Sequence, residues 1–168
     1  MVRPARPDDA VALGKIHVTA WQQAYRGVFT DDFLDGLDSE ARADWFRRTI
    51  GSGPEILVTE ESGRVAGFCI FGPADEEGWA EVYAIYIAPD LWGRGHGRAL
   101  LEATEQRLAD SGYGRVLLWV VDSNRGARAF YERVGWSLGR RVRLEEIGGA
   151  QVTLVRYQKL LRSPSAPA

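Results

Sequence analysis

The stretch WAEVYAIYIAPDLWGRGHGRALL, residues 79–101, decides the fold. Its first nine residues are mainly apolar and β-prone, which predicts a strand over 79–87 that stops before a proline. A loop with three glycines follows, at Gly93, Gly95 and Gly97, and an amphipathic helix begins directly after it. The first backbone N–H groups of a helix lack intrahelical acceptors, and the helix dipole is positive there. This order of strand, loop and helix therefore predicts an anion site, and we expect a phosphate in it.

The glycine loop does not match the common nucleotide-binding sequences. A GxGxxG fingerprint would need glycine at position 98 or 100, where the chain has Arg98 and Leu100, and no GxxxxGK[ST] occurs in the chain. The six residues from Trp92 to Gly97 instead resemble the acetyl-CoA loop of the GNAT family of N-acetyltransferases, usually written R/Q-x-x-G-x-G/A. Trp92 departs from this pattern, because it stands where the family prefers Arg or Gln.

Length and composition indicate one ordinary globular domain. The chain has 168 residues and a net charge of -2, which gives no indication of nucleic acid or a membrane as a partner. The single cysteine, Cys69, cannot form an internal disulfide, and we expect it to be a small buried hydrophobe rather than a nucleophile. His17 and His96 are the only histidines and no HExxH or CxxC occurs, so no metal site is expected. Without a signal peptide or a long apolar run, the sequence favours a cytoplasmic protein.

In the rest of the chain, the spacing of apolar residues separates predicted strands from predicted helices. Strands are predicted over 2–5, 55–59, 65–71, 79–87, 116–121, 136–147 and 151–160. Helices are predicted to begin near residues 8–9, 30 and 39, after the glycine loop, and after a cap at 122–124. The run 116–121 is apolar without alternation, as in a parallel strand covered on both faces, so it forms a predicted βαβ unit with 79–87. The domain is expected to span 1–162, with a disordered tail at 163–168.

A second motif strengthens the family resemblance. The sequence N-x-x-A-x-x-F-Y-x-x-x-G-W follows the glycine loop at residues 124–136, and AWQQAYRGVFTDDFL at 20–34 resembles the opening helix of one branch of the family. The resemblance covers nearly the whole chain. It implies a single α/β (α+β) GNAT-like domain with a central mixed, mostly antiparallel sheet of about seven strands. About four helices would flank the sheet, and strands 4 and 5 would splay apart in a V.

The same resemblance implies acetyl-CoA as the acyl donor. Its pyrophosphate is expected at the backbone of Gly93, Arg94, Gly95, His96, Gly97 and Arg98. The side chains of Arg94 and Arg98 either add charge there or are simply solvated. The pantetheine arm would pair with the strand edge at Ile85, Tyr86 and Ile87, where a backbone N–H would polarise the thioester carbonyl. Asn124 either bonds this arm or caps its own helix.

Two residues are candidates for proton transfer. Tyr131 matches the family's general-acid tyrosine, which would protonate the departing thiolate, although a residue on its apolar stripe can also be core. Glu81 is the best candidate for the base, because its predicted face is shared with aromatic residues that would raise its pKa. An exposed residue or a salt bridge is the alternative. Some relatives have a carboxylate on the fifth strand where this chain has Trp119, and Asp122 is a fallback base.

The expected activity is transfer of the acetyl group to a primary amine by direct attack in a ternary complex. Trp21, Tyr25 and Tyr83 are candidates for the acceptor pocket, together with His17. A small-molecule amine is slightly favoured over a protein N-terminus or lysine, and relatives of this kind often form homodimers. The alternative function is a non-catalytic acyl-CoA sensor that kept the loop without turnover.

Overall fold

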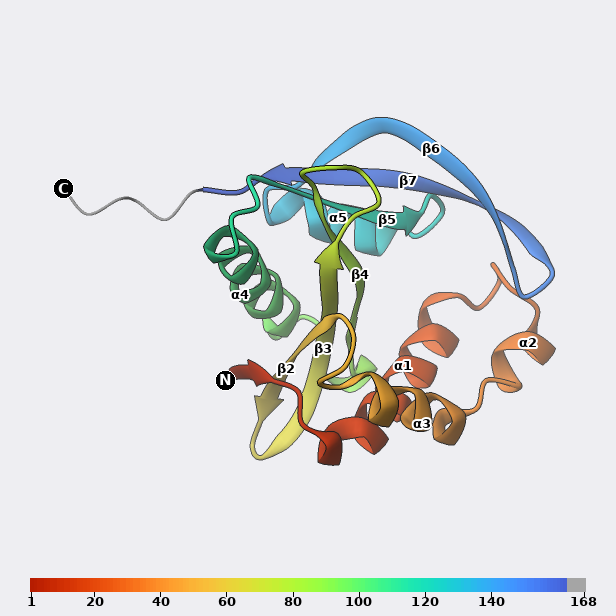
Figure 1. Ribbon diagram of the computed structural model, residues 1–168. Helices are drawn as coiled ribbons and strands as arrows, with labels where there is room; N and C mark the ends of the chain where they lie inside the picture. Colours follow the sequence, from red (N-terminus) through yellow and green to blue (C-terminus); the bar gives the residue numbers. More distant parts are fainter. Residues whose placement is uncertain (163–168) are drawn as a thin grey trace. The chain divides into compact units, whose positions relative to one another are not determined.

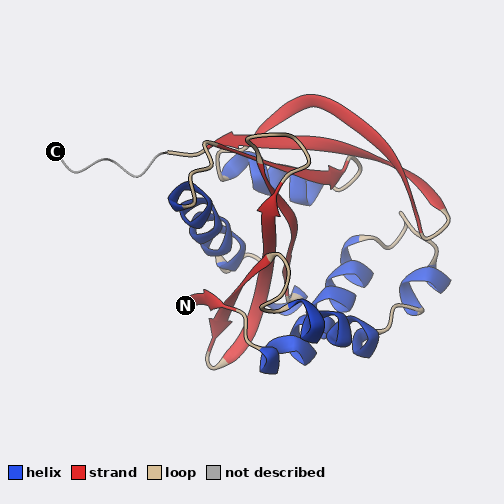
Figure 2. Ribbon diagram, viewed as in Figure 1, coloured by secondary structure: helices blue, strands red, loops and turns tan. Residues whose placement is uncertain are grey.

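The computed structural model describes residues 1–162, so the tail predicted at 163–168 lies outside the described residues. The strands form one seven-stranded sheet in the order β1-β2-β3-β4-β5-β7-β6 (Figure 1). They are β1 (Val2–Pro4), β2 (Glu55–Glu61), β3 (Arg64–Pro73), β4 (Ala80–Ile87), β5 (Arg115–Val121), β6 (Ser137–Ile147) and β7 (Ala150–Leu160). The α-helices are α1 (Ala10–Ala24), α2 (Asp31–Asp35), α3 (Ser39–Thr49), α4 (His96–Asp110) and α5 (Arg125–Arg133) (Figure 2). Two 3-10 turns, η1 (Pro7–Asp9) and η2 (Pro89–Leu91), precede α1 and the glycine loop.

The sheet is mixed and mostly antiparallel, as the sequence predicts. The pairs β1–β2, β2–β3, β5–β7 and β6–β7 are antiparallel. β4 and β5 are parallel, with Ala80–Val82 opposite Val116–Leu118, and α4 connects them, which confirms the predicted βαβ unit. The described residues contain five α-helices, which begin near the five predicted starts, and the five-residue α2 forms on a Thr30 cap.

One compact unit comprises residues 1–71 and 84–104. Its core brings together apolar residues of α1, α3, β2 and β3, among them Leu13, Ile16, Phe46, Val58 and Phe68. α1 and α3 approach closely at Gly14, where an added Cβ would lie 2.4 Å from the carbonyl oxygen of Ser39. Cys69 is buried in this unit, and burial raises the pKa of its thiol to about 12, which fits the predicted role as a small hydrophobe.

The second compact unit comprises, among the described residues, 72–83 and 105–162. Within it β5 pairs with β4 on one side and β7 on the other, and β6 and β7 form a long hairpin (Figure 1). The hairpin turns at Gly148 and Gly149, whose φ angles of 56° and 77° suit the predicted two-glycine turn. α5 packs on the face of β7 that carries Tyr157, where the Tyr131 ring lies 5.8 Å from the Tyr157 ring.

Two negative findings concern the residues that the structure describes. Within 1–162 no helix combines the length and apolar character needed to cross a membrane. In the same part of the chain, no three or more His, Cys, Asp or Glu side chains gather in a group that could hold a metal ion.

Candidate active site

The glycine loop combines left-handed backbone with a helix start. Gly93 and Gly95 have φ angles of 78° and 88°, which favour glycine, and both are exposed. α4 begins at His96, so Gly97 lies in the first turn of the helix rather than in the predicted loop. The first intrahelical bond runs from the Ala99 N–H to the Gly95 carbonyl at 3.0 Å. The N–H groups of residues 96–98 therefore precede the helical ladder and are available to an anion.

The charged side chains of this segment have protein partners. Arg94 is exposed and donates to Glu61 at 3.3 Å, and Arg98 donates to Glu102 at 2.7 Å. His96 points back to β2, with Nδ1 3.3 Å from the Thr59 hydroxyl oxygen. Both arginines therefore lie at the solvated surface in ion pairs that a stronger anion can replace, since exposed pairs contribute little.

Trp92, the departure from the family pattern, has a structural role. Its indole Nε1 donates to the Ile87 carbonyl oxygen at 2.8 Å. The bond ties the start of the glycine loop to the last residue of β4. The indole is 47% exposed, so it anchors the loop from the surface rather than from the core.

The predicted pantetheine edge lies at the end of β4. Tyr86 and Ile87 pack partly against the core, and the Tyr86 hydroxyl accepts a hydrogen bond from Trp21 Nε1 at 2.8 Å. Ile85, on the opposite side of the strand from its neighbours in sequence, is half-buried. Burial raises the pKa of the Tyr86 hydroxyl, so Tyr86 is a neutral structural residue whose backbone is the part available to the arm.

The second motif lies on α5. Asn124 caps this helix, because its Oδ1 accepts from the Ala127 N–H at 3.1 Å. Of the two roles predicted for Asn124, the structure therefore shows the helix cap. Tyr131 is 8% exposed and packs between the rings of Phe130, Trp136 and Tyr157. Its ring is thus firmly held on one face of the sheet.

Glu81 lies on the other face of the sheet from Tyr131. It is the register partner of Leu117, whereas α5 covers the face of the Leu118–Tyr157 pair. Glu81 is partly buried, and burial is the main cause that raises the pKa of its carboxyl. Nearby Arg143 opposes this rise. The direction of the shift matches the prediction for a base that works near neutral pH.

The predicted acceptor aromatics belong to both compact units. Trp21 and Tyr25 lie in the first unit, in contact with each other and with Phe29, at ring separations of 5.0 to 5.7 Å. His17 stacks on Trp21 at 5.6 Å, and burial lowers its pKa to about 3, so it is neutral at pH 7. Tyr83 belongs to the second unit, where it is 44% exposed and its hydroxyl donates to the Pro73 carbonyl.

Sequence reasoning missed the arginines on the Glu81 face. Arg156 is only 4% exposed, Arg143 stacks on the Trp119 ring at 4.4 Å, and Glu76 accepts from Arg156 at 2.7 Å. The available signal was Arg156 itself, an arginine directly between the apolar run at 154–155 and Tyr157. Its partners come from a loop about 80 positions earlier, as the Arg156–Glu76 bond shows.

Comparisons with known proteins agree with this architecture. The family model of the acetyltransferase (GNAT) family matches residues 18–136. The uncharacterized N-acetyltransferase YuaI of Bacillus subtilis is 32% identical over 127 residues, which cover 73% of this chain and 72% of that protein. The L-amino acid N-acyltransferase MnaT of Escherichia coli is 27% identical, over 80% of this chain and 78% of that protein.

A solved structure has the same fold. The yncA protein of Salmonella typhimurium, solved with its cofactor acetyl-CoA, superposes with a TM-score of 0.72 over 100% of this chain and 97% of that chain, at 23% identity. The two motifs predicted the same family, and the family model covers most of the chain. The chain therefore belongs to the GNAT family of N-acetyltransferases and is an acyltransferase enzyme.

Proposed function

We propose that residues 1–162 transfer an acetyl group from acetyl-CoA to the primary amine of a small molecule, by direct attack in a ternary complex. The observation that carries this proposal is the exposed helix start after Gly93 and Gly95. At both glycines a Cβ would meet open space, so the surface there is free for a diphosphate to approach the backbone. Acetyl-CoA, when bound, supplies the acetyl thioester.

The N–H groups of His96, Gly97 and Arg98 would hold the diphosphate, with Arg94 as an additional cation. The strand edge at residues 85–87 would take the pantetheine arm, and a backbone N–H there would stabilise the negative charge on the thioester oxygen. The amide nitrogen of Asn124 is available to the arm, because its cap uses Oδ1. These residues act by position and hydrogen bonding rather than by covalent chemistry.

Glu81 and Tyr131 would divide the proton transfers. Glu81 takes a proton from the acceptor ammonium, and the freed amine nitrogen forms the C–N bond as the C–S bond breaks. Tyr131 gives its proton to the departing sulfur, and the second proton that the nitrogen loses as the amide forms returns through solvent to the Tyr131 oxygen. Glu81 and Tyr131 lie on opposite faces of the sheet. This placement suits a reaction in which the amine attacks from one face and the thiolate sulfur leaves on the other. The parallel pairing of β4 and β5 covers three residue pairs, Ala80–Val82 with Val116–Leu118.

A small amine is the favoured acceptor. The MnaT relative is named an L-amino acid N-acyltransferase, which supports a small molecule carrying a primary amine. The half-buried, raised-pKa carboxyl of Glu81 also favours a compact acceptor that can be desolvated beside it.

The decisive experiment measures release of free CoA thiol from acetyl-CoA with a panel of amines. The panel should hold amino acids, polyamines, simple alkyl and aryl amines, and short peptides. Turnover with at least one small amine, and slower turnover with peptides, is expected. Tight acetyl-CoA binding without turnover on any member would instead support the sensor function.

A further inference from the structure

A set of arginines shares a sheet face with Glu81. Residues directly opposite in a sheet share a face, as do residues two apart in a strand. Glu81 pairs with Leu117, and Trp119 two positions on pairs with Arg156. Arg156 shares its face with Leu154, which pairs with Arg143 on β6. The register therefore places two arginines on the same sheet face as the candidate base, across the four neighbouring strands β4, β5, β7 and β6.

Arg156 is a buried cation with an incomplete set of partners. Its Nη1 donates to Glu76 Oε2 at 2.7 Å, and its guanidinium lies 4.3 Å from the centre of the Trp79 ring. The Nε atom is buried and has no hydrogen-bond partner among the residues that the structure describes. Because Glu76 uses Nη1, the fork of Nε and Nη2 remains, and this fork is a geometry that binds a carboxylate through two bonds. A buried donor without a partner is costly, so a ligand that supplies an acceptor there gains free energy.

Arg143 supplies a second, accessible cation. Its guanidinium lies 4.4 Å from the centre of the Trp119 ring although β7 separates their strands, so the side chain reaches across β7 toward β5. The side chain is 45% exposed, and its protein partner is Glu145 at 2.8 Å on the same strand. It also acts on the carboxyl of Glu81, together with Arg156. Both guanidinium groups thus lie within electrostatic reach of the candidate base.

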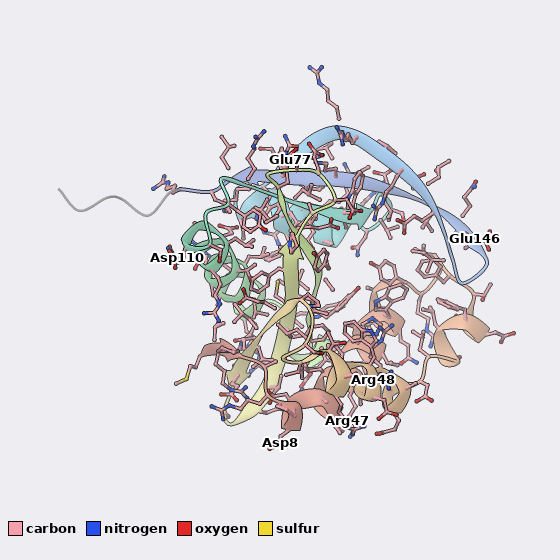
Figure 3. The ribbon with its side chains drawn as sticks, in the orientation of Figure 1. Asp8, Arg47, Arg48, Glu77, Asp110 and Glu146 are labelled. Atoms are coloured by element: carbon pink, nitrogen blue, oxygen red, sulfur yellow. The ribbon has the colours of Figure 1, made fainter. Side chains whose placement is uncertain are left out.

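Acidic side chains accompany the arginines of this face. Glu76 serves two arginines at once, since Arg141 donates to the same Oε2 atom at 2.9 Å. Glu77, labelled in Figure 3, follows Glu76 in the acidic loop between β3 and β4. Glu145 partners Arg143. A site with fixed charges of both signs favours a ligand with both signs, because an amine alone would face the arginines without compensation.

We propose that the acceptor carries a carboxylate beside its amine, as an α-amino acid does, and that Arg143 and Arg156 bind this carboxylate while Glu81 faces the amine. Trp79 and Trp119 form the flat walls on which the guanidinium groups are held. This inference rests on the proposed function and narrows its substrate class. It requires no new covalent step.

Matched acceptors test the carboxylate. The panel compares phenylalanine, phenylalanine amide, phenethylamine and the dipeptide Phe-Gly, followed by the equivalent leucine set, because these share a side chain and differ in the carboxylate. The free amino acid should have a kcat/KM roughly 10- to 100-fold above its amide and amine, mainly through KM. The dipeptide should also be a poor acceptor, because its carboxylate lies one residue farther from the amine. A kcat/KM for phenethylamine equal to or above that for phenylalanine would overturn the inference.

Variants of the exposed arginine test the assignment. Arg143→Gln should raise KM for the amino acid about tenfold or more, whereas KM for phenethylamine, which has no carboxylate, should change far less. Any change that comes from the loss of the Arg143 charge near Glu81 is common to both acceptors. Arg143→Lys should recover part of the loss, because it keeps the charge without the fork. Arg140→Gln removes a charge from an exposed residue of the same strand and should match the parent protein. An equal effect of Arg143→Gln on both acceptors would contradict a carboxylate contact.

Arg156 is tested with its folding monitored. Arg156→Lys should raise KM for the amino acid selectively, and circular dichroism reports whether the fold survives. If that variant unfolds, the Arg143 series alone decides. Turnover of simple amines without preference for a carboxylate would reject this inference and keep the proposed function, whereas a lack of turnover with every acceptor would reject the proposed function itself.

Discussion

The indole Nε1 of Trp92 donates to the carbonyl oxygen of Ile87 at 2.8 Å, so the last residue of β4 and the first residue of the glycine loop are joined directly. The end of β4 and the start of the glycine loop are thereby held in a fixed relation. Trp92 stands where the family pattern has Arg or Gln, and in this chain its indole N–H forms the link.

Trp92→Phe removes this bond while keeping an aromatic ring. Because one exposed hydrogen bond contributes roughly 0.5–1.5 kcal/mol, the Kd for acetyl-CoA should rise about two- to tenfold. Titration calorimetry measures the change, and thermal unfolding provides the control. An unchanged Kd would show that the bond does not position the loop.

Tyr131→Phe should lower kcat by about 100-fold or more, because general acid catalysis by a positioned group contributes on that scale. Its ring would keep the packing with Trp136 and Tyr157, so affinity for acetyl-CoA should change little. Stopped-flow detection of free thiol measures the rate. Tyr157→Phe, which removes the hydroxyl bonded to Glu132, is the matched control and should retain most activity. A normal rate in Tyr131→Phe would remove the assigned role.

If Glu81 is the base, its pKa determines how kcat/KM falls at low pH, which is the acid limb of the pH profile. The base form of a carboxyl exists above its pKa, and burial raises that pKa, so kcat/KM should rise with pH through a midpoint above that of an ordinary glutamate. Glu81→Gln should lower kcat/KM by about 100-fold and remove this limb. Glu146→Gln, on the exposed end of β6 (Figure 3), is the control. If the limb persists in Glu81→Gln, another group or a water chain takes the proton.

The sequence predicted those parts of the molecule that depend on short segments. The strand, glycine loop and helix at 79–110 are specified locally by an apolar run and by glycines that need left-handed backbone. The sequence predicts Gly97 in the loop, but α4 begins at His96, so Gly97 has helical backbone. A glycine in a sequence does not reveal whether its freedom is used.

Long-range features were beyond the sequence. The Arg156–Glu76 pair joins β7 to the loop between β3 and β4, which lies about 80 positions earlier in the sequence. Asn124 shows the opposite case, because its position before a helix already indicated a cap and the structure contains that cap. Burial of a polar group depends on what distant segments bring to it, and no local pattern encodes that.

His17 makes folding stability depend on pH. Its pKa is lowered from 6.5 to about 3 by burial, with a smaller effect of Arg42, so below pH 6.5 the unfolded chain binds a proton that the folded chain does not. The stabilisation is therefore complete above pH 6.5 and is lost as pH falls toward 3. Between pH 6.5 and 5 the loss should reach about 2 kcal/mol.

Urea unfolding at pH 7 and pH 5 measures this effect. His17→Gln, which cannot titrate, should lose less stability between the two pH values than the parent protein, whatever its stability at pH 7. The difference between the two proteins isolates His17 from the carboxyl groups that titrate in the same range. Equal losses in both proteins would mean that His17 is not kept neutral by its surroundings.

Calorimetric titration of acetyl-CoA tests most directly whether backbone amides at the start of α4 bind its diphosphate. The parent protein should bind with saturable heat, and Gly95→Val should weaken binding at least tenfold, because a β-branched residue is strained at a φ of 88°. Gly112→Val, at a φ of 91° just beyond the other end of α4, is the matched control for strain and should bind normally. No heat with the folded parent protein, or equal binding by Gly95→Val, would contradict the account.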